Sequence, residues 1–397
     1  MPGVSEHASI NPDLLRWARE TSGYSLEAAA KKIDIDPSLL LRAEQVTATL
    51  TVPQLRKAAV AYKRPADIFY LSEPPAPLPQ PRDFRTVGNT NAQNPELTPD
   101  MRLEWRRALL KRATALELLA EQGESPPTIS IKAKISEDPE GVAQRVTNWL
   151  DISAPKRPYN RAPRLMLNNW IRLIEAHGVL VFQTSGIEIE EARGLSYWAK
   201  ELPFILLNGK DAYRPRLFTL LHELVHLLLR ETGSACDPLR SGVNLSPIET
   251  FCNRVAAAIL IPRENILEHP LVIRRTSVRQ RWPDSVIQKL ADKYGVSRQV
   301  LLIRLQHLGL TDSLFVQNRL EAFEEEYRRS ELNKPKVVRT GGPLPSSIAL
   351  RDNGRRFCRL VLTAVDANVI SEIDAANYLG LKTKHFDTIR DAIERAG

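Results

Sequence analysis

Two histidines spaced four residues apart constrain this 397-residue chain more than any other feature. They flank a glutamate in the run His222-Glu223-Leu224-Val225-His226. On a helix, positions i and i+4 share a face, so both imidazoles can bind one zinc ion while Glu223 reaches the attacking water as general base. The pattern therefore predicts a metal-binding helix with the chemistry of a metallopeptidase.

Apolar side chains fill most other positions from Pro215 to Leu229, which predicts a helix buried on most sides. Burying two imidazoles and a carboxylate without partners would cost several kcal/mol, and a cation that takes the histidines as ligands removes much of that cost. The alternative is a chance match, which average residue frequencies give in roughly 1% of chains of this length.

A catalytic zinc ion takes three protein ligands, so a third ligand is expected downstream. Glu249 is the best candidate, because it begins a helical pattern that Pro262 ends. The run Ser246-Pro247-Ile248-Glu249 also fits a capping box, in which Glu249 only bonds back to the helix start. The residues alone leave both interpretations open. The weaker candidates for the third ligand are Glu231, Asp237 and His269.

The order of these motifs resembles the ImmA/IrrE family of zinc endopeptidases over roughly residues 163–310. The resemblance rests on His222-Glu223-x-x-His226, Glu249-x-x-x-Asn253-x-x-Ala256-Ala257, Leu260-Ile261-Pro262, Arg216-x-Phe218-Thr219 and Leu206-Leu207-Asn208. It implies that Glu249 is the third zinc ligand, since the glutamate of the second motif has that role in the family. Cys252 and Val255 depart from the family pattern without removing a ligand.

Composition is that of a soluble protein of two or three domains, with 43% hydrophobic and 26% charged residues. No apolar run reaches the length of a membrane span, and the N-terminus lacks the blocks of a signal peptide. The three cysteines show no paired metal spacing. We expect a cytoplasmic protein.

Four short helical patterns precede residue 70, at residues 11–21, 25–33, 37–45 and 52–62, with Ser25 and Thr51 placed as N-caps. The second and third have the rhythm of a helix-turn-helix, and the segment resembles the Xre class of DNA-binding domain. The expected contacts with DNA are Lys31, Lys32, Ser38, Leu41, Arg42 and Gln45. Nine basic against eight acidic residues make this segment nearly neutral, so a module for protein contacts or dimerisation is the alternative.

Composition shifts divide the chain into seven segments, and five prolines between Pro74 and Pro81 mark the clearest boundary. We expect an Xre-type domain at 1–73, a linker at 74–86, a helical connecting region at 87–162 and a zinc peptidase core at 163–270. A helical tail at 271–330, a second linker at 331–347 and a small helical module at 348–397 follow.

The predicted fold class is α+β and mostly helical. A helix at residues 97–122 precedes the core, which has a helix at 164–177 and strands at 179–183 and 204–207 before the zinc helix. If the strand ending near Asn208 lies at a sheet edge, a substrate can bind as an added strand. Two more helix-Gly-helix patterns, at residues 285–308 and 369–393, resemble helix-turn-helix units but are common in ordinary helical bundles.

These features predict a cytoplasmic, zinc-dependent endopeptidase that is also a transcriptional regulator. Its expected partners are operator DNA and one specific protein, such as a repressor, and a homodimer is a further expectation. The substrate class is implied by the family resemblance. The alternative is a non-proteolytic antitoxin or repressor that binds operator DNA and a partner toxin. Tyr213, Arg214 and Arg254 are the candidates for stabilising the oxyanion.

Overall fold

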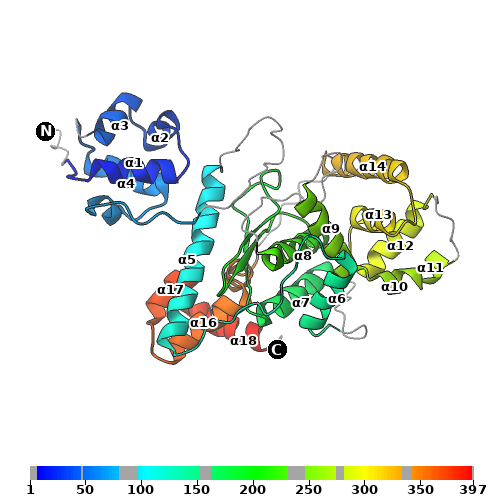
Figure 1. Cartoon of the computed structure of the whole chain (residues 1–397). Helices are drawn as coiled ribbons and strands as arrows, with labels where there is room; N and C mark the ends of the chain where they lie inside the picture. Colours follow the sequence, from blue (N-terminus) through cyan, green and yellow to red (C-terminus); the bar gives the residue numbers. More distant parts are fainter. Residues whose placement is uncertain are drawn as a thin grey trace. The chain divides into compact units, whose positions relative to one another are not determined.

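The computed structural model describes residues 7–45, 48–79, 97–152, 162–230, 246–273, 281–332 and 342–395. This part of the chain is mostly helical with one three-stranded sheet, consistent with the predicted α+β class. It divides into two compact units, Met1–Gln80 with Gln93–Leu109 and Pro81–Ala92 with Leu110–Gly397. Helix α5 (Pro99–Glu121) contributes its first half to one unit and its second half to the other (Figure 1).

The first unit begins with the four helices expected from the sequence. They are α1 (Pro12–Thr21), α2 (Leu26–Ile33), α3 (Pro37–Glu44) and α4 (Val52–Tyr62), and the short 3-10 helix η1 (Ala66–Tyr70) follows. Both predicted N-caps are confirmed: the Ser25 hydroxyl accepts the Ala28 N–H, and Thr51 forms a capping box with Gln54. Such caps stabilise a helix start by about 1 kcal/mol each.

The sheet of the second unit has the strand order β1-β3-β2. Strands β1 (Leu180–Thr184) and β3 (Phe204–Asn208) were expected, and they pair in parallel from Leu180 opposite Phe204. Strand β2 (Gly194–Tyr197) was not predicted and pairs antiparallel with β3. The strand that ends at Asn208 is therefore central, so the condition for adding a substrate strand beside it is not met. Strand β2 pairs with β3 and lies at the edge of the described sheet.

In the described residues, one continuous apolar core contains side chains from the sheet and from nine helices. They are α6 (Pro139–Trp149), α7 (Pro163–Ala176), α8 (Tyr213–Leu229), α9 (Pro247–Leu260), α10 (Arg263–Leu267), α11 (Pro270–Ile273), α12 (Asp284–Tyr294), α13 (Arg298–His307) and α14 (Ser313–Leu332). The sequence predicted α7, α8, α9, α12 and α13 to within a few residues.

The C-terminal part of the second unit is a group of short helices. They are α15 (Pro345–Asn353), α16 (Arg355–Asp366), α17 (Glu372–Leu379), η3 (Thr383–His385) and α18 (Phe386–Glu394). The linker expected at residues 331–347 overlaps helices at both ends, because α14 continues to Leu332 and Pro345 occupies the first turn of α15, where proline is well tolerated. Residues 333–341 of that linker, and 80–86 of the first one, lie outside the described residues.

Two buried polar side chains hold the segments around the carboxyl end of the sheet, the loop before β2 and the start of α8. Asn208, at the end of β3, donates to the carbonyl oxygens of Ile187, Glu188 and Ala192, and so holds the loop that leads into β2. Arg216, in the first turns of α8, donates to the Gln183 side chain at 2.9 Å and to the Gly209 carbonyl at 2.5 Å. These bonds fix α8 and β2 relative to the carboxyl end of the sheet.

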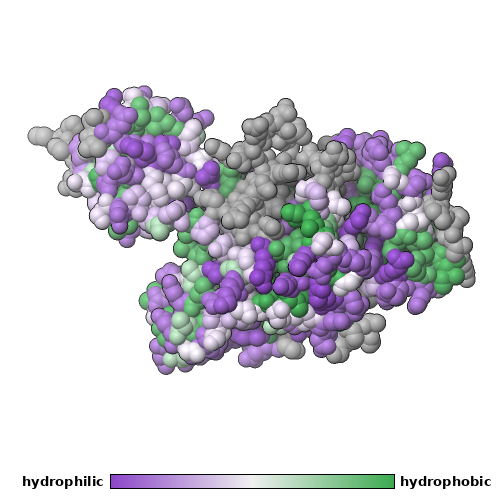
Figure 2. All heavy atoms as spheres, in the orientation of Figure 1, coloured by the Kyte–Doolittle hydropathy of each residue, from purple (hydrophilic) through white to green (hydrophobic). Residues whose placement is uncertain are grey.

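None of the helices in the described ranges is long and apolar enough to cross a membrane. On the face drawn in Figure 2, the first unit carries hydrophilic residues with small hydrophobic patches between them.

Candidate metal centre

Helix α8 carries the two histidines through the middle of the core. His222 and Glu223 have no exposed surface, and 1% of His226 is exposed. Apolar residues of the core pack against the other positions of this helix and bury it, as its sequence predicts. The two imidazoles extend from one face, with their ring centroids 4.8 Å apart. Three ionisable side chains therefore lie inside an otherwise apolar helix environment.

Helix α9 brings Glu249 to the same place. The Ser246 hydroxyl caps α9 by accepting the Glu249 backbone N–H at 3.3 Å. The Glu249 carboxylate extends to the histidines and lies 3.1 Å from His222 Nε2 and 3.3 Å from His226 Nε2. The serine half of the predicted capping box is thus present, while the carboxylate faces α8.

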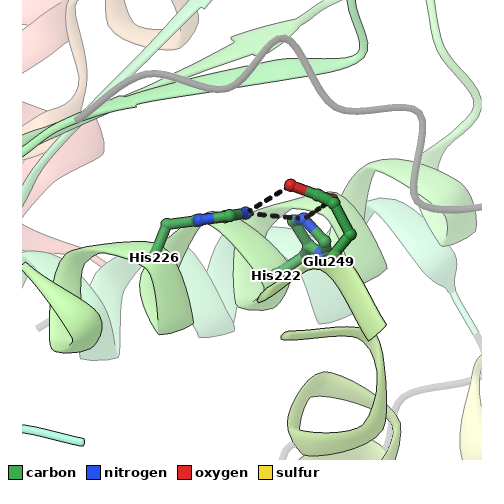
Figure 3. A group of neighbouring side chains, drawn as sticks. All are labelled: His222, His226 and Glu249. Carbon is green, nitrogen blue, oxygen red and sulfur yellow. Dashed lines mark hydrogen bonds and ion pairs between the residues drawn. The ribbon is translucent and has the colours of Figure 1, made fainter. Parts of the chain in front are cut away.

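Three possible ligand atoms converge where α8 and α9 meet (Figure 3). The Nε2 atoms of His222 and His226 are 3.0 Å apart. At that distance one ring nitrogen must donate a hydrogen to the other, unless a cation takes both lone pairs. His222, His226 and Glu249 form the one group of this kind among the residues that the structure describes.

The spacing of these atoms fits a tetrahedral zinc site. Nitrogen and oxygen ligands about 2.0–2.1 Å from a tetrahedral zinc ion lie about 3.3 Å from one another. The two Nε2 atoms lie 3.0 Å apart, His222 Nε2 lies 3.1 Å from Glu249 Oε2, and His226 Nε2 lies 3.3 Å from Glu249 Oε1. Two imidazoles and one carboxylate are also a ligand set that catalytic zinc takes in peptidases. Both the donor types and their spacing suit the metal that the sequence predicts.

The charge of Glu249 agrees with a role beside cations. Burial opposes its ionisation, but hydrogen bonds and positive charge from His222 and His226 outweigh burial and lower the pKa of its carboxyl well below the usual range. Glu249 is also the most accessible of the three, with 16% of its side chain exposed. Solvent therefore reaches the Glu249 side chain.

Gly194, the first residue of β2, lies directly against Glu223. A Cβ atom added there would be 2.5 Å from Thr219 Cγ2, 3.1 Å from Glu223 Cγ and 3.2 Å from Glu223 Oε1. An added Cβ atom would overlap with Thr219 Cγ2 and press tightly on the Glu223 side chain, and glycine avoids both contacts. The sequence analysis missed Gly194 because β2 was not predicted, although an isolated glycine in a short strand can signal close approach of another group.

Of the weaker candidates for a third ligand, His269 lies in the described residues and does not belong to this group. His269 accepts the Leu271 backbone N–H through its own ring, and burial followed by the charge of Lys293 lowers the pKa of its imidazole. Glu231 and Asp237 lie outside the described residues.

The oxyanion candidates have other contacts. Arg214 pairs with Asp292 at 2.7 Å, and the guanidinium of Arg216 lies over the Tyr213 ring. The side chain of Arg254 is exposed on α9 and contributes positive charge near His307.

Five of the predicted DNA contacts lie on α2 and α3 of the first unit, and the sixth, Gln45, directly follows α3. Lys31 and Lys32 are exposed in the last turn of α2, and Ser38 is exposed at the start of α3. Leu41 is 41% exposed, Arg42 lies 3.4 Å from the Ser38 hydroxyl, and Gln45 is the C-cap of α3. Their accessibility permits contact with a partner, and their role in DNA binding stays a prediction.

Comparison with known families bears on the second unit. Residues 174–306 match Peptidase_M78, the IrrE N-terminal-like domain. The matched segment runs from the end of α7 through most of α13, so it contains the whole sheet and both helices of the candidate metal centre. The match supports the ImmA/IrrE resemblance and a metallopeptidase-type hydrolase, and it leaves the N-terminal unit outside. No curated protein matches the chain.

Proposed function

We propose that this chain is a zinc-dependent endopeptidase whose metal is held by His222, His226 and Glu249. The convergence of these three side chains from α8 and α9, at separations suited to zinc, is the observation that carries the proposal. The position of Glu223 beside the ligands on α8 adds a proton carrier. The IrrE N-terminal-like match to the same segment gives independent support.

Glu223 is proposed as general base and then general acid. A bound zinc ion would polarise the scissile carbonyl and acidify a water molecule at the site. Glu223 accepts the proton of the attacking water and later delivers it to the leaving amine. Its lack of exposed surface limits the positions open to the carboxylate, which favours a defined proton-transfer geometry.

The edge strand β2 is proposed to position the substrate. Within the described residues β2 pairs with β3 alone, and its first residue, Gly194, contacts Glu223. A peptide that adds as a further strand to this edge passes beside the general base in an extended conformation. This geometry suits cleavage within a chain, and we propose that the substrate is one specific partner protein, such as a transcriptional repressor.

Cleavage by a glutamine variant tests the catalytic proposal. The full-length protein is incubated with proteins encoded by neighbouring genes, and cleavage is followed by gel electrophoresis and mass spectrometry. Glu223→Gln should retain zinc and lose roughly 10²–10⁴-fold in cleavage rate, the range for general acid-base catalysis. Glu188→Gln, at an exposed glutamate of the same unit, is the control and should cleave normally. Full activity of Glu223→Gln would contradict the assignment, and zinc binding without cleavage would favour a binding role as antitoxin or repressor.

We further propose that the first unit binds operator DNA through α2 and α3, so that the peptidase acts in transcriptional regulation. The support is the order of α1 to α4 and the exposure of the six predicted contacts. Gel shifts with the promoter of its own gene should weaken for Arg42→Ala and change little for Arg56→Ala, an exposed arginine on α4. Equal shifts by both variants would remove support for this surface.

A further inference from the structure

Asn253 is the polar partner of His222 on the side away from the converging ligand atoms. Its Oδ1 lies 2.9 Å from His222 Nδ1, and both side chains are buried. Asn253 follows Glu249 by four residues on α9, so the two side chains share one face of that helix. One helix thus presents a carboxylate to Nε2 of this imidazole and an amide to its Nδ1.

We propose that Asn253 is a positioning residue that fixes the tautomer and rotation of the His222 ring for metal binding. The inference rests on the proposed zinc site. An amide oxygen can only accept a hydrogen bond, so the atom facing it, His222 Nδ1, must carry the proton. A neutral imidazole then has its lone pair on Nε2, the atom that lies 3.0 Å from His226 Nε2.

The opposite orientation of the amide would defeat the site. If the Asn253 nitrogen faced His222, Nδ1 would accept, and Nε2 would carry the proton toward the metal position. A ligating histidine commonly donates its other ring N–H to a carbonyl or carboxylate oxygen, which fixes the ring and raises its basicity. Asn253→Asp keeps the accepting oxygen, whereas Asn253→Ala removes it. Comparing these two variants therefore shows whether the hydrogen-bond acceptor is what zinc binding needs.

Zinc affinity of the full-length chain tests the inference without a substrate. Competition with a chromophoric chelator gives the zinc Kd of the wild type, Asn253→Ala and Asn253→Asp. We expect Asn253→Ala to bind zinc about 10–100-fold more weakly, as for other partners of metal-binding histidines. Asn253→Asp should bind at least as tightly as the wild type. Asn353→Ala is the matched control, since Asn353 is a buried asparagine that donates to the Leu379 carbonyl in the C-terminal helices, and its zinc Kd should not change.

A second measurement uses the natural chain alone. Nitrogen-15 chemical shifts of the imidazoles in the metal-free protein, assigned with a His222→Gln variant, report which ring nitrogen carries the proton. The expected result is a proton on Nδ1 of His222. An Nδ1 of His222 that carries no proton, an unchanged Kd in Asn253→Ala, or a Kd in Asn253→Asp as weak as in Asn253→Ala would overturn the inference. Absence of zinc binding by the wild type would instead overturn the proposed function.

Discussion

Glu249 and Glu175 are two glutamates of the second unit whose carboxylates meet opposite environments. Glu249 is on α9, whose own Ser246 caps the helix, and its carboxylate faces His222 and His226. Glu175 is on α7, and its Oε1 accepts the Arg356 N–H at the start of α16 at 3.4 Å. Helix α16 has Gly354 as N-cap and no side-chain cap of its own.

The ionisation of the two carboxyls differs accordingly. The histidines lower the pKa of Glu249 despite burial. Burial raises the pKa of Glu175 to about 7, although the backbone N–H groups and charges of Arg356 and Arg355 act against the rise. Burial alone thus favours a neutral carboxyl, as at Glu175. Glu249 stays charged because the imidazoles of His222 and His226 face it. Because Ser246 caps α9, the Glu249 carboxylate is available to a cation. Helix α16 has no side-chain cap of its own, and the Glu175 carboxylate of α7 accepts an N–H at its start.

The largest expected difference between the two is in metal affinity. Glu249→Ala should weaken zinc binding by more than about 100-fold, because losing a ligand exceeds the effect of losing an outer partner. Glu175→Gln should leave the zinc Kd unchanged. Competition with a chelator measures both. Equal zinc affinities for Glu249→Ala and the wild type would contradict the role of Glu249 as a zinc ligand.

Protonation of Glu175 should make the stability of the second unit depend on pH. Because the folded-state pKa of about 7 lies above the ordinary 4.5, the stabilising contribution is complete below pH 4.5 and is lost as pH rises through 7. The loss amounts to about 3 kcal/mol at 1.36 kcal/mol per pKa unit. Urea unfolding of the wild type and Glu175→Gln should diverge by this amount between pH 4.5 and 8, with the glutamine variant more stable at pH 8. Parallel pH profiles would show that Glu175 is not held neutral.

Glu223 is a third glutamate of the second unit, and its buried side chain lies against Gly194. Gly194→Ala inserts a methyl group 2.5 Å from Thr219 Cγ2 and 3.2 Å from Glu223 Oε1, and we expect a loss of about 1–3 kcal/mol in unfolding free energy from overpacking. Adding Thr219→Ser removes the closest contact and should restore part of that stability, while cleavage stays reduced because Glu223 is still displaced. If Gly194→Ala keeps both full stability and full cleavage, the proposed contact has no role.

The smallest effect concerns the cap that leaves Glu249 available. Ser246→Ala should lower the unfolding free energy by about 1 kcal/mol, the usual value of an N-cap. Ser246→Asp is the matched variant that retains a capping oxygen and should be close to the wild type. Thermal unfolding with and without zinc measures both. A larger loss in the zinc-bound protein than in the metal-free protein would show that the cap also positions Glu249.

Local sequence rules predicted the helices of the site and not the packing around it. The i and i+4 spacing of His222 and His226, and the caps Ser25 and Thr51, depend on neighbouring residues and could be predicted from the sequence. Whether Glu249 faces the helix start or the histidines depends on how α9 packs on α8, so both interpretations stayed open. The role of Gly194 depends on β2, whose four residues carry too short a pattern to identify as a strand.

The zinc content of the purified full-length protein, measured by mass spectrometry of the metal, shows whether His222 and Glu249 hold a metal ion. We expect about one zinc ion per chain in the wild type and in Glu175→Gln, and almost none in a variant that combines His222→Ala with Glu249→Ala. A wild-type protein that takes up no zinc when supplied with it, or a double variant that binds as much as the wild type, would contradict the assignment of this site.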